Sequence, residues 1–127
     1  MSVQQTITMM AELAQGTAGT AENHYITVPT AGEWLFKAAY INVNTTAALD
    51  GSNYATIALK QGATTVSSFD TSATTLTAGT SQALTNAAAG ASAELGQGDT
   101  LHLAVTKTGT GIAVKGIVTV SLQSVVS

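Results

Sequence analysis

The sequence predicts an all-β protein: an antiparallel β-sandwich, or jelly roll, of about seven to eight strands with an N-terminal arm. Short stretches of alternating apolar and polar residues recur along the chain, separated by turn residues at spacings of about 8–12 residues. No segment has a convincing long-helix pattern, and no internal repeat suggests a solenoid or propeller. The 127 residues are enough for one domain with its own core.

The composition is poor in charge. Charged residues make up 9% of the chain, against about 25% in a typical globular domain. Hydrophobic residues make up 45%, many of them alanine, so we expect a thin core beneath a surface of Thr, Ser, Ala, Gln and Asn. Such a surface contacts another protein with little ionic desolvation and resists association poorly.

The charges and the absence of cysteine exclude several classes of function. Four lysines, no arginine and a net charge of −3 leave no basic patch for nucleic acid. Without cysteine there is neither a disulfide framework nor a thiolate metal site. The N-terminus lacks a secretory signal pattern, and no run approaches the roughly 18 apolar residues of a membrane helix. We therefore expect assembly in a cytoplasm and no membrane partner.

Residues 1–20 are expected to form an N-terminal arm or a first strand, and residues 21–127 the sandwich domain. Gln5, Ile7 and Met9 would share one face of a strand, and the β-branched residues around them favour an extended segment. A helical spacing of apolar residues three or four apart is the alternative. The Gly-containing stretch that follows would end either element.

A short strand at 23–28 and a turn from Pro29 to Glu33 lead into a long strand, Trp34 to Asn44. Regular alternation gives this strand two partly apolar faces. One face carries Leu35, Ala39, Ile41 and Val43, and the other carries Trp34, Phe36, Ala38 and Tyr40. Because a strand offers one face to the core of a sandwich, the second face must meet a loop, the N-terminal arm or another subunit.

Shorter strands are expected at 54–60, 64–69 and 81–86. Polar loops at 45–53 and 70–93 separate them, and the second loop is low in complexity. These short strands would complete the two sheets.

The clearest pattern lies near the C-terminus, where strands at 100–106 and 112–123 flank a Gly-rich turn. The inward residues of the two strands would be Leu101, Leu103 and Val105, then Ile112, Val114, Val118, Val120 and Leu122. Period-two alternation around such a turn predicts an antiparallel hairpin with one buried face.

No group of residues points to catalysis or ligand binding. Gly96 and Gly98 lack the third glycine of a dinucleotide loop and precede a strand, so they indicate a turn. His24 and His102 lack metal-ligand spacing, and the loop at Asp50 fits a turn better than a calcium loop. We therefore expect no catalytic, cofactor-binding or metal site, and a protein that is not an enzyme.

Six apolar residues are candidates for a subunit or capsid interface: Val3, Ile7, Met9, Trp34, Phe36 and Tyr40. Trp and Tyr are enriched where proteins meet, and the two-faced strand leaves some of these side chains without a place in one core. Ordinary core packing is the alternative for each of them. His102 should face solvent or an interface, because its neighbours Leu101 and Leu103 point the other way.

Three segments resemble the small jelly-roll proteins of tailed bacteriophage particles. They are Ile26 to Trp34, with its strand–Pro-x-x-Gly–aromatic opening; Leu49 to Leu59; and Leu95 to Thr106, followed by Thr108-Gly109-Thr110-Gly111-Ile112. The resemblance covers about residues 23–123. Its motifs mostly encode turns, and tumour-necrosis-factor-like jelly rolls share some of them.

The resemblance implies a structural virion protein, a capsid decoration (cement) protein on the outer capsid surface. Its partners would be the major capsid protein and copies of itself, usually as a homotrimer, with the N-terminal arm as a capsid contact. A receptor- or glycan-binding domain of a phage tail fibre, spike or head fibre is the alternative. A small hydrolase or lyase using Asp50, Asp99 and His102 is the third and weakest hypothesis.

Overall fold

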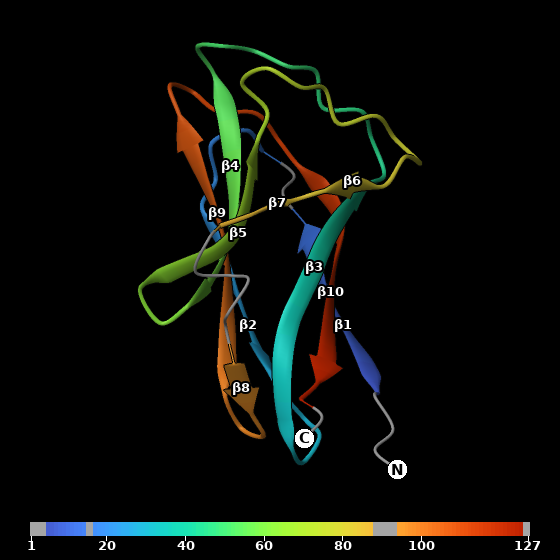
Figure 1. The fold of residues 1–127 in the computed structure, drawn as a ribbon. Coiled ribbons are helices and arrows are strands. Elements are labelled where there is room, and N and C mark those ends of the chain that lie inside the picture. Colours follow the sequence, from blue (N-terminus) through green and yellow to red (C-terminus); the bar gives the residue numbers. More distant parts are fainter. Residues whose placement is uncertain (1–4, 15–16, 88–93, 126–127) are drawn as a thin grey trace.

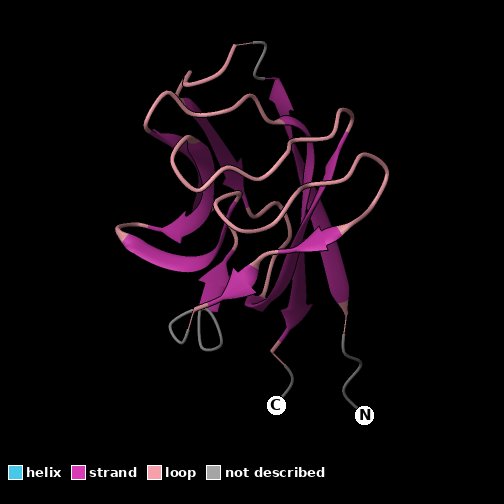
Figure 2. Cartoon of the chain, turned by 90° about the horizontal axis from the view of Figure 1, so that it is seen from above, coloured by secondary structure: helices cyan, strands magenta, loops and turns pink. Residues whose placement is uncertain are grey.

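The computed structural model describes residues 5–14, 17–87 and 94–125, which form strands and loops without a helix (Figures 1 and 2). The strands are β1 (Thr6–Ala14), β2 (Glu22–Thr27), β3 (Glu33–Val43), β4 (Tyr54–Gln61), β5 (Thr64–Asp70), β6 (Gln82–Ala83), β7 (Thr85–Asn86), β8 (Glu94–Gly96), β9 (Thr100–Thr108) and β10 (Lys115–Ser124). This is the all-β sandwich that the sequence predicts.

Two antiparallel five-stranded sheets face each other. Sheet A has the order β1-β10-β3-β6, with β8 also paired to β3, and sheet B has the order β2-β9-β4-β5-β7. Strands that follow one another in sequence mostly lie in opposite sheets, which is a jelly-roll-like arrangement. The excess over the expected seven or eight strands comes from the two-residue and three-residue strands β6, β7 and β8.

The C-terminal hairpin prediction was wrong. β9 pairs with β2 and β4 in sheet B, whereas β10 pairs with β1 and β3 in sheet A, so the Gly-rich turn carries the chain from one sheet to the other. The predicted inward residues of both strands are nevertheless buried, except Ile112, which is partly buried against the core. Alternation identifies the buried face of a strand but not the strand beside it, and β9 and β10 turn these faces toward each other across the core.

The two-faced interpretation of β3 was also wrong, because the strand contains a β-bulge. Phe36 pairs with Leu122 and Ala38 with Ser121, which leaves Lys37 as the extra residue. The bulge shifts the phase of the alternation by one residue. Trp34 and Phe36 before it, and Ala39, Ile41 and Val43 after it, therefore all face one core.

The core fills the space between the sheets with aliphatic side chains from both. Its largest fully buried members are Trp34, Leu13, Ile41, Ile57, Leu59, Leu76, Leu95, Leu101, Leu103, Leu122, Val28 and Val43. The indole of Trp34 also donates a hydrogen bond from Nε1 to the Thr30 carbonyl oxygen at 3.1 Å. Trp34 therefore anchors the turn that precedes its own strand.

The expected single strand at 81–86 is instead a crossing between the sheets. β6 pairs with β3 in sheet A, and β7 pairs with β5 in sheet B. Between them, Leu84 is buried and donates its backbone N–H to the Ala39 carbonyl oxygen at 2.9 Å. One flank of the sandwich is thereby spanned by the chain itself (Figure 1).

The opposite flank is formed by β1 and β2, the edge strands of sheets A and B. β1 pairs with β10 along its whole length, and Met9 and Leu13 enter the core. At the end of β1, the Glu22 carboxylate of β2 accepts the backbone N–H of Ala14 at 2.9 Å. Residues 6–14 are thus an integral strand of the sandwich.

Candidate interaction surface

Most of the predicted contact residues lie inside the molecule. Trp34 and Phe36 are each 2% exposed and Met9 is 8% exposed, while Ile7 is partly buried against the core. Val3 lies outside the described residues. Of the predicted set, Tyr40 is the large side chain that the fold leaves exposed, at 42%.

Tyr40 belongs to an apolar cluster on the outer face of sheet A. Pairing across β1, β10 and β3 aligns Met10 with Thr119 and Thr119 with Tyr40. Ile117 lies two residues from Thr119 on the same face, so it is the diagonal neighbour of both Met10 and Tyr40. We call Met10, Tyr40 and Ile117 the sheet A cluster; their exposed fractions are 69%, 42% and 43%.

Most neighbours of the sheet A cluster are uncharged, but the Glu12 carboxylate lies beside it. Thr119 lies within the row, and Ala83 of β6 pairs with Tyr40 at its end. The nearest charges along the strands are Glu12, paired with Ile117, and Lys115. Contact with another protein would therefore bury methyl, thioether and aromatic groups, and it would also cover the Glu12 carboxylate opposite Ile117.

Sequence reasoning missed two of the three cluster residues. Met10 follows Met9, which was assigned to the contact face, and Ile117 precedes the inward Val118. For Ile117 the alternation of the strand was the available signal, because the neighbour of an inward residue points outward. For Met10 it became a signal only once Met9 was known to face the core. Their proximity to Tyr40 depends on the sheet order, which alternation does not give.

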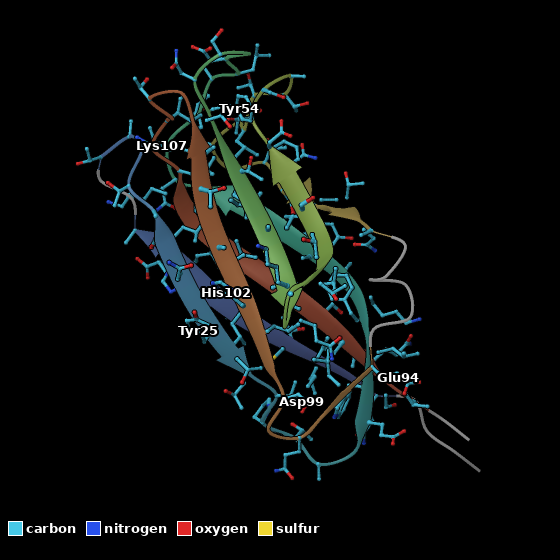
Figure 3. All side chains as sticks on the ribbon, turned by 90° about the vertical axis from the view of Figure 1, so that its left-hand side faces the viewer. Tyr25, Tyr54, Glu94, Asp99, His102 and Lys107 are labelled. Atoms are coloured by element: carbon cyan, nitrogen blue, oxygen red, sulfur yellow. The ribbon has the colours of Figure 1, made fainter. Side chains whose placement is uncertain are left out.

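The outer face of sheet B carries a second exposed aromatic group. Tyr25 of β2, 68% exposed, stacks on His102 of β9 with ring centroids 4.6 Å apart and an interplanar angle of 9° (Figure 3). His102 Nε2 also lies 2.8 Å from Asn23 Oδ1. His102 thus points away from the core, as its position between Leu101 and Leu103 predicts.

The two histidines do not share a site. His24 Nε2 contacts the Glu22 carboxylate at 2.9 Å, on the face of β2 opposite to Tyr25. His102 lies on the outer face of sheet B. Within residues 5–14, 17–87 and 94–125, no three His, Asp or Glu side chains are grouped so that they could hold a metal ion.

The carboxylates of Asp50, Asp70 and Asp99 each bond to the backbone of their own turn. Asp50 Oδ1 accepts the backbone N–H of Ser52 at 2.8 Å and of Asn53 at 2.9 Å, and these bonds lower the pKa of the exposed carboxyl, that from Asn53 most. Asp99 Oδ2 accepts the Gly96 N–H at 2.8 Å. Such bonds favour the turn conformation.

Asp70 is held in the same way. Its Oδ1 accepts both the hydroxyl and the backbone N–H of Ser72, and these bonds lower the pKa of the carboxyl, the hydroxyl contributing most. A carboxylate fixed in this way is kept ionised and oriented toward its own turn. These positions are explained by loop structure without reference to catalysis.

No family model and no curated protein matches the sequence. The fold is similar to that in a structure of Bacillus endospore appendages, described as disulfide-linked pili, with 19% identity, a TM-score of 0.42, and coverage of 99% of this chain and 89% of that one. It is also similar to part of a structure of the Gx strain of infectious bursal disease virus, with 14% identity and a TM-score of 0.31; this match covers 99% of this chain and 37% of that one.

This chain contains no cysteine, so the disulfide linkage named for the Bacillus appendages cannot form in it. In the part of the chain that the structure describes, no helix is long and apolar enough to cross a membrane.

Proposed function

We propose that this chain is a structural, non-enzymatic subunit that binds another protein through the outer face of sheet A. The observation that carries the proposal is the sheet A cluster: Met10, Tyr40 and Ile117 lie close together and exposed on one sheet face, whose other residues near them are mostly uncharged. Exposed apolar groups gathered on one face are typical of protein interaction sites.

The more specific role that we propose is capsid decoration on a tailed bacteriophage head. The sequence segments that resemble small phage jelly-roll proteins support it, as does a chain with 9% charged residues. In this role the sheet A cluster rests on the major capsid protein at the outer capsid surface. Each contact can be weak, because an oligomer that engages several capsid sites gains affinity from its high effective concentration.

The role is tested by binding the chain to expanded capsids of the phage that encodes it. Ile117→Lys places a charge in the sheet A cluster, and Thr106→Lys places the same charge at an exposed position in sheet B as the matched control. We expect cosedimentation with capsids to be lost in the first variant and retained in the second. Retention by both variants would show that the sheet A cluster is not the contact.

Copy number distinguishes decoration from a minor structural role. Gel densitometry of purified particles should give a large number of copies per head, and heads lacking the chain should break at lower temperature or lower salt. A few copies per particle would rule out decoration.

The stacked pair Tyr25 and His102 favours a second candidate function, a receptor- or glycan-binding domain. A flat exposed aromatic group on a sheet is suited to packing against the apolar face of a sugar, and Asn23 offers polar atoms beside it. A glycan array tests this, with Tyr25→Ala as the variant expected to abolish any hit. An array without hits for the unmodified chain would remove this candidate.

A further inference from the structure

Among the residues that the structure describes, no strand pairs with the outer edge of β1. Along β1, the backbone N–H and C=O groups of successive residues alternate: those of one residue bond to β10, and those of the next point away from β10. The Gln5 carbonyl oxygen accepts the backbone N–H of Ser124 at 2.8 Å, and the Gln5 N–H donates to the Ser124 hydroxyl at 2.7 Å, so the backbone groups of the odd-numbered residues of this segment face β10. The backbone groups of Thr6, Thr8, Met10, Glu12 and Ala14 therefore point outward, and the bond from the Ala14 N–H to Glu22 agrees with this assignment.

β1 has few of the features that usually prevent edge pairing, and its one charged side chain, Glu12, lies near the C-terminal end of the strand. Its sequence, TITMMAELA, has no proline and no lysine, and its register with β10 runs without a shift from Thr6 to Ala14. Within the described part of the chain, β1 pairs only with β10, and Glu22 bonds to its outer edge at Ala14. The free stretch thus runs from Thr6 to Glu12, and its midpoint is Met9.

We propose that two copies of this chain pair along β1, antiparallel, to join their A sheets into one continuous sheet. With the two-fold axis at Met9, the four free residues match each other: Thr6 pairs with Glu12 of the second copy, and Thr8 with Met10 of the second copy. This register makes about eight backbone hydrogen bonds, two for each of four hydrogen-bonded pairs. A partner of this geometry is self-complementary, as two-fold interfaces are.

The side chains fit this register on both faces. On the inner face, Met9 lies opposite Met9 of the second copy, and Ile7 lies opposite Ala11 of the second copy. Ile7 and Ala11 are apolar residues that remain partly exposed at the rim of the core, so the second copy covers them. On the outer face, the two Met10 side chains are diagonal neighbours within reach of each other.

The charges also favour this register. Glu12 lies opposite a threonine hydroxyl, which can donate to its carboxylate. The two Glu12 residues lie six positions apart along the strands, or about 20 Å at about 3.3 Å per residue, so they do not repel each other at close range. Pairing through β1 joins the two sheet A clusters into one wider apolar surface but does not depend on what that surface binds.

Analytical ultracentrifugation of the full chain tests the pairing. We expect a dimer for the unmodified chain and a monomer for Thr8→Pro, because proline removes an outward N–H while leaving the bonds to β10 in place. Met10→Lys is a second variant that should give a monomer, since it brings two like charges together across the two-fold axis. Ile117→Lys makes the same apolar-to-lysine change on the same face, one strand further in, and should remain dimeric.

Amide hydrogen exchange locates the contact. In concentrated samples the outward N–H groups of Thr8 and Met10 should be protected, and dilution to the monomer should remove the protection. A trimer, as the phage resemblance implies, or a dimer that survives Thr8→Pro would overturn the proposal, because antiparallel pairing of one edge with itself closes at two copies. Capsid binding should be lost in Ile117→Lys, which stays dimeric, and only weakened in Thr8→Pro, which loses the gain from linked contacts; the first loss supports the proposed function independently of the pairing.

Discussion

Deleting Lys37 should leave the sandwich folded, although Lys37 lies in the middle of its longest strand. Lys37 is the extra residue of the bulge, so its removal leaves Phe36 opposite Leu122 and Ala38 opposite Ser121. The shortened strand then alternates regularly, and the buried residues on both sides of the deletion keep their places in the core.

The cost can be estimated from the contacts. The Lys37 carbonyl oxygen accepts a hydrogen bond from Asn86 Nδ2 at 3.0 Å. Losing one such bond destabilises a protein by about 0.5–1.5 kcal/mol. Side-chain burial in the core is otherwise unchanged, so the free energy of unfolding should fall by about that amount.

Deletion of Thr119 is the matched control. Thr119 lies in the regular part of β10, where no bulge can absorb the change, so Val120 and Leu122 would turn outward. Both are fully buried, and burying such a side chain is worth about 1.5–3 kcal/mol, which gives a loss of about 3–6 kcal/mol. This is comparable with the whole stability of a small domain, about 5–15 kcal/mol.

Guanidinium denaturation, followed by the fluorescence of the single tryptophan, measures both variants. Trp34 is buried next to the deletion, so its emission also reports whether the inward face is kept. A Lys37 deletion that loses as much stability as the Thr119 deletion, or that exposes Trp34 to water, would refute the phase-shift explanation of the bulge.

Three further predictions concern stability. Gly116→Ala should lower the free energy of unfolding by about 1–3 kcal/mol in a denaturant titration, because a Cβ at this position would lie 2.7 Å from Val43 Cα of β3. An unchanged free energy of unfolding would mean that β3 and β10 separate easily at this point. Leu103→Ala should cost about 2–5 kcal/mol, since its side chain is fully buried, and an unchanged melting temperature would contradict its place in the core. Hydrogen bonds from Ser72 lower the pKa of Asp70 below its ordinary 3.8, so the ionised carboxylate stabilises the fold above that pH, and acidification removes this stabilisation. Asp70→Asn should therefore make stability fall less steeply at acidic pH. An unchanged acid dependence would contradict this role of Asp70.

Alternation predicts which residues are buried far better than which strands are neighbours. Leu101, Val105 and Val118 were all assigned to the inward face, and all are buried. The same pattern suits a hairpin within one sheet and a connection between two facing sheets, because the inward faces are apolar in both cases. The connection at Gly109 and Gly111 could be assigned only from the three-dimensional arrangement.

The bulge left a trace in the sequence that has two explanations. Apolar residues in both phases of one strand indicate either two buried faces or a phase shift between two halves. The apolar residues before and after Lys37 fit the second explanation, but no residue type marks the bulge, since Lys37 is an ordinary exposed strand residue. The interface role expected of Trp34 and Phe36 depended on the first explanation.

The candidate surface was predictable only in part. Tyr40 was identified from its residue type, whereas Met10 and Ile117 become significant once β1, β10 and β3 are known to be adjacent. The free edge of β1 likewise depends on topology, because a strand is an edge only with respect to its sheet.

The crossing between β6 and β7 has a consequence for how far assembly can proceed. The crossing spans the flank opposite β1. On the same flank, the Gln61 side chain donates a hydrogen bond to the Glu94 carbonyl oxygen of β8 at 2.9 Å. A protein with one free strand edge pairs with one neighbour and then stops, whereas a protein with free edges on both flanks can grow into a filament. With the flank opposite β1 occupied in this way, the proposed pairing along β1 would stop at two copies.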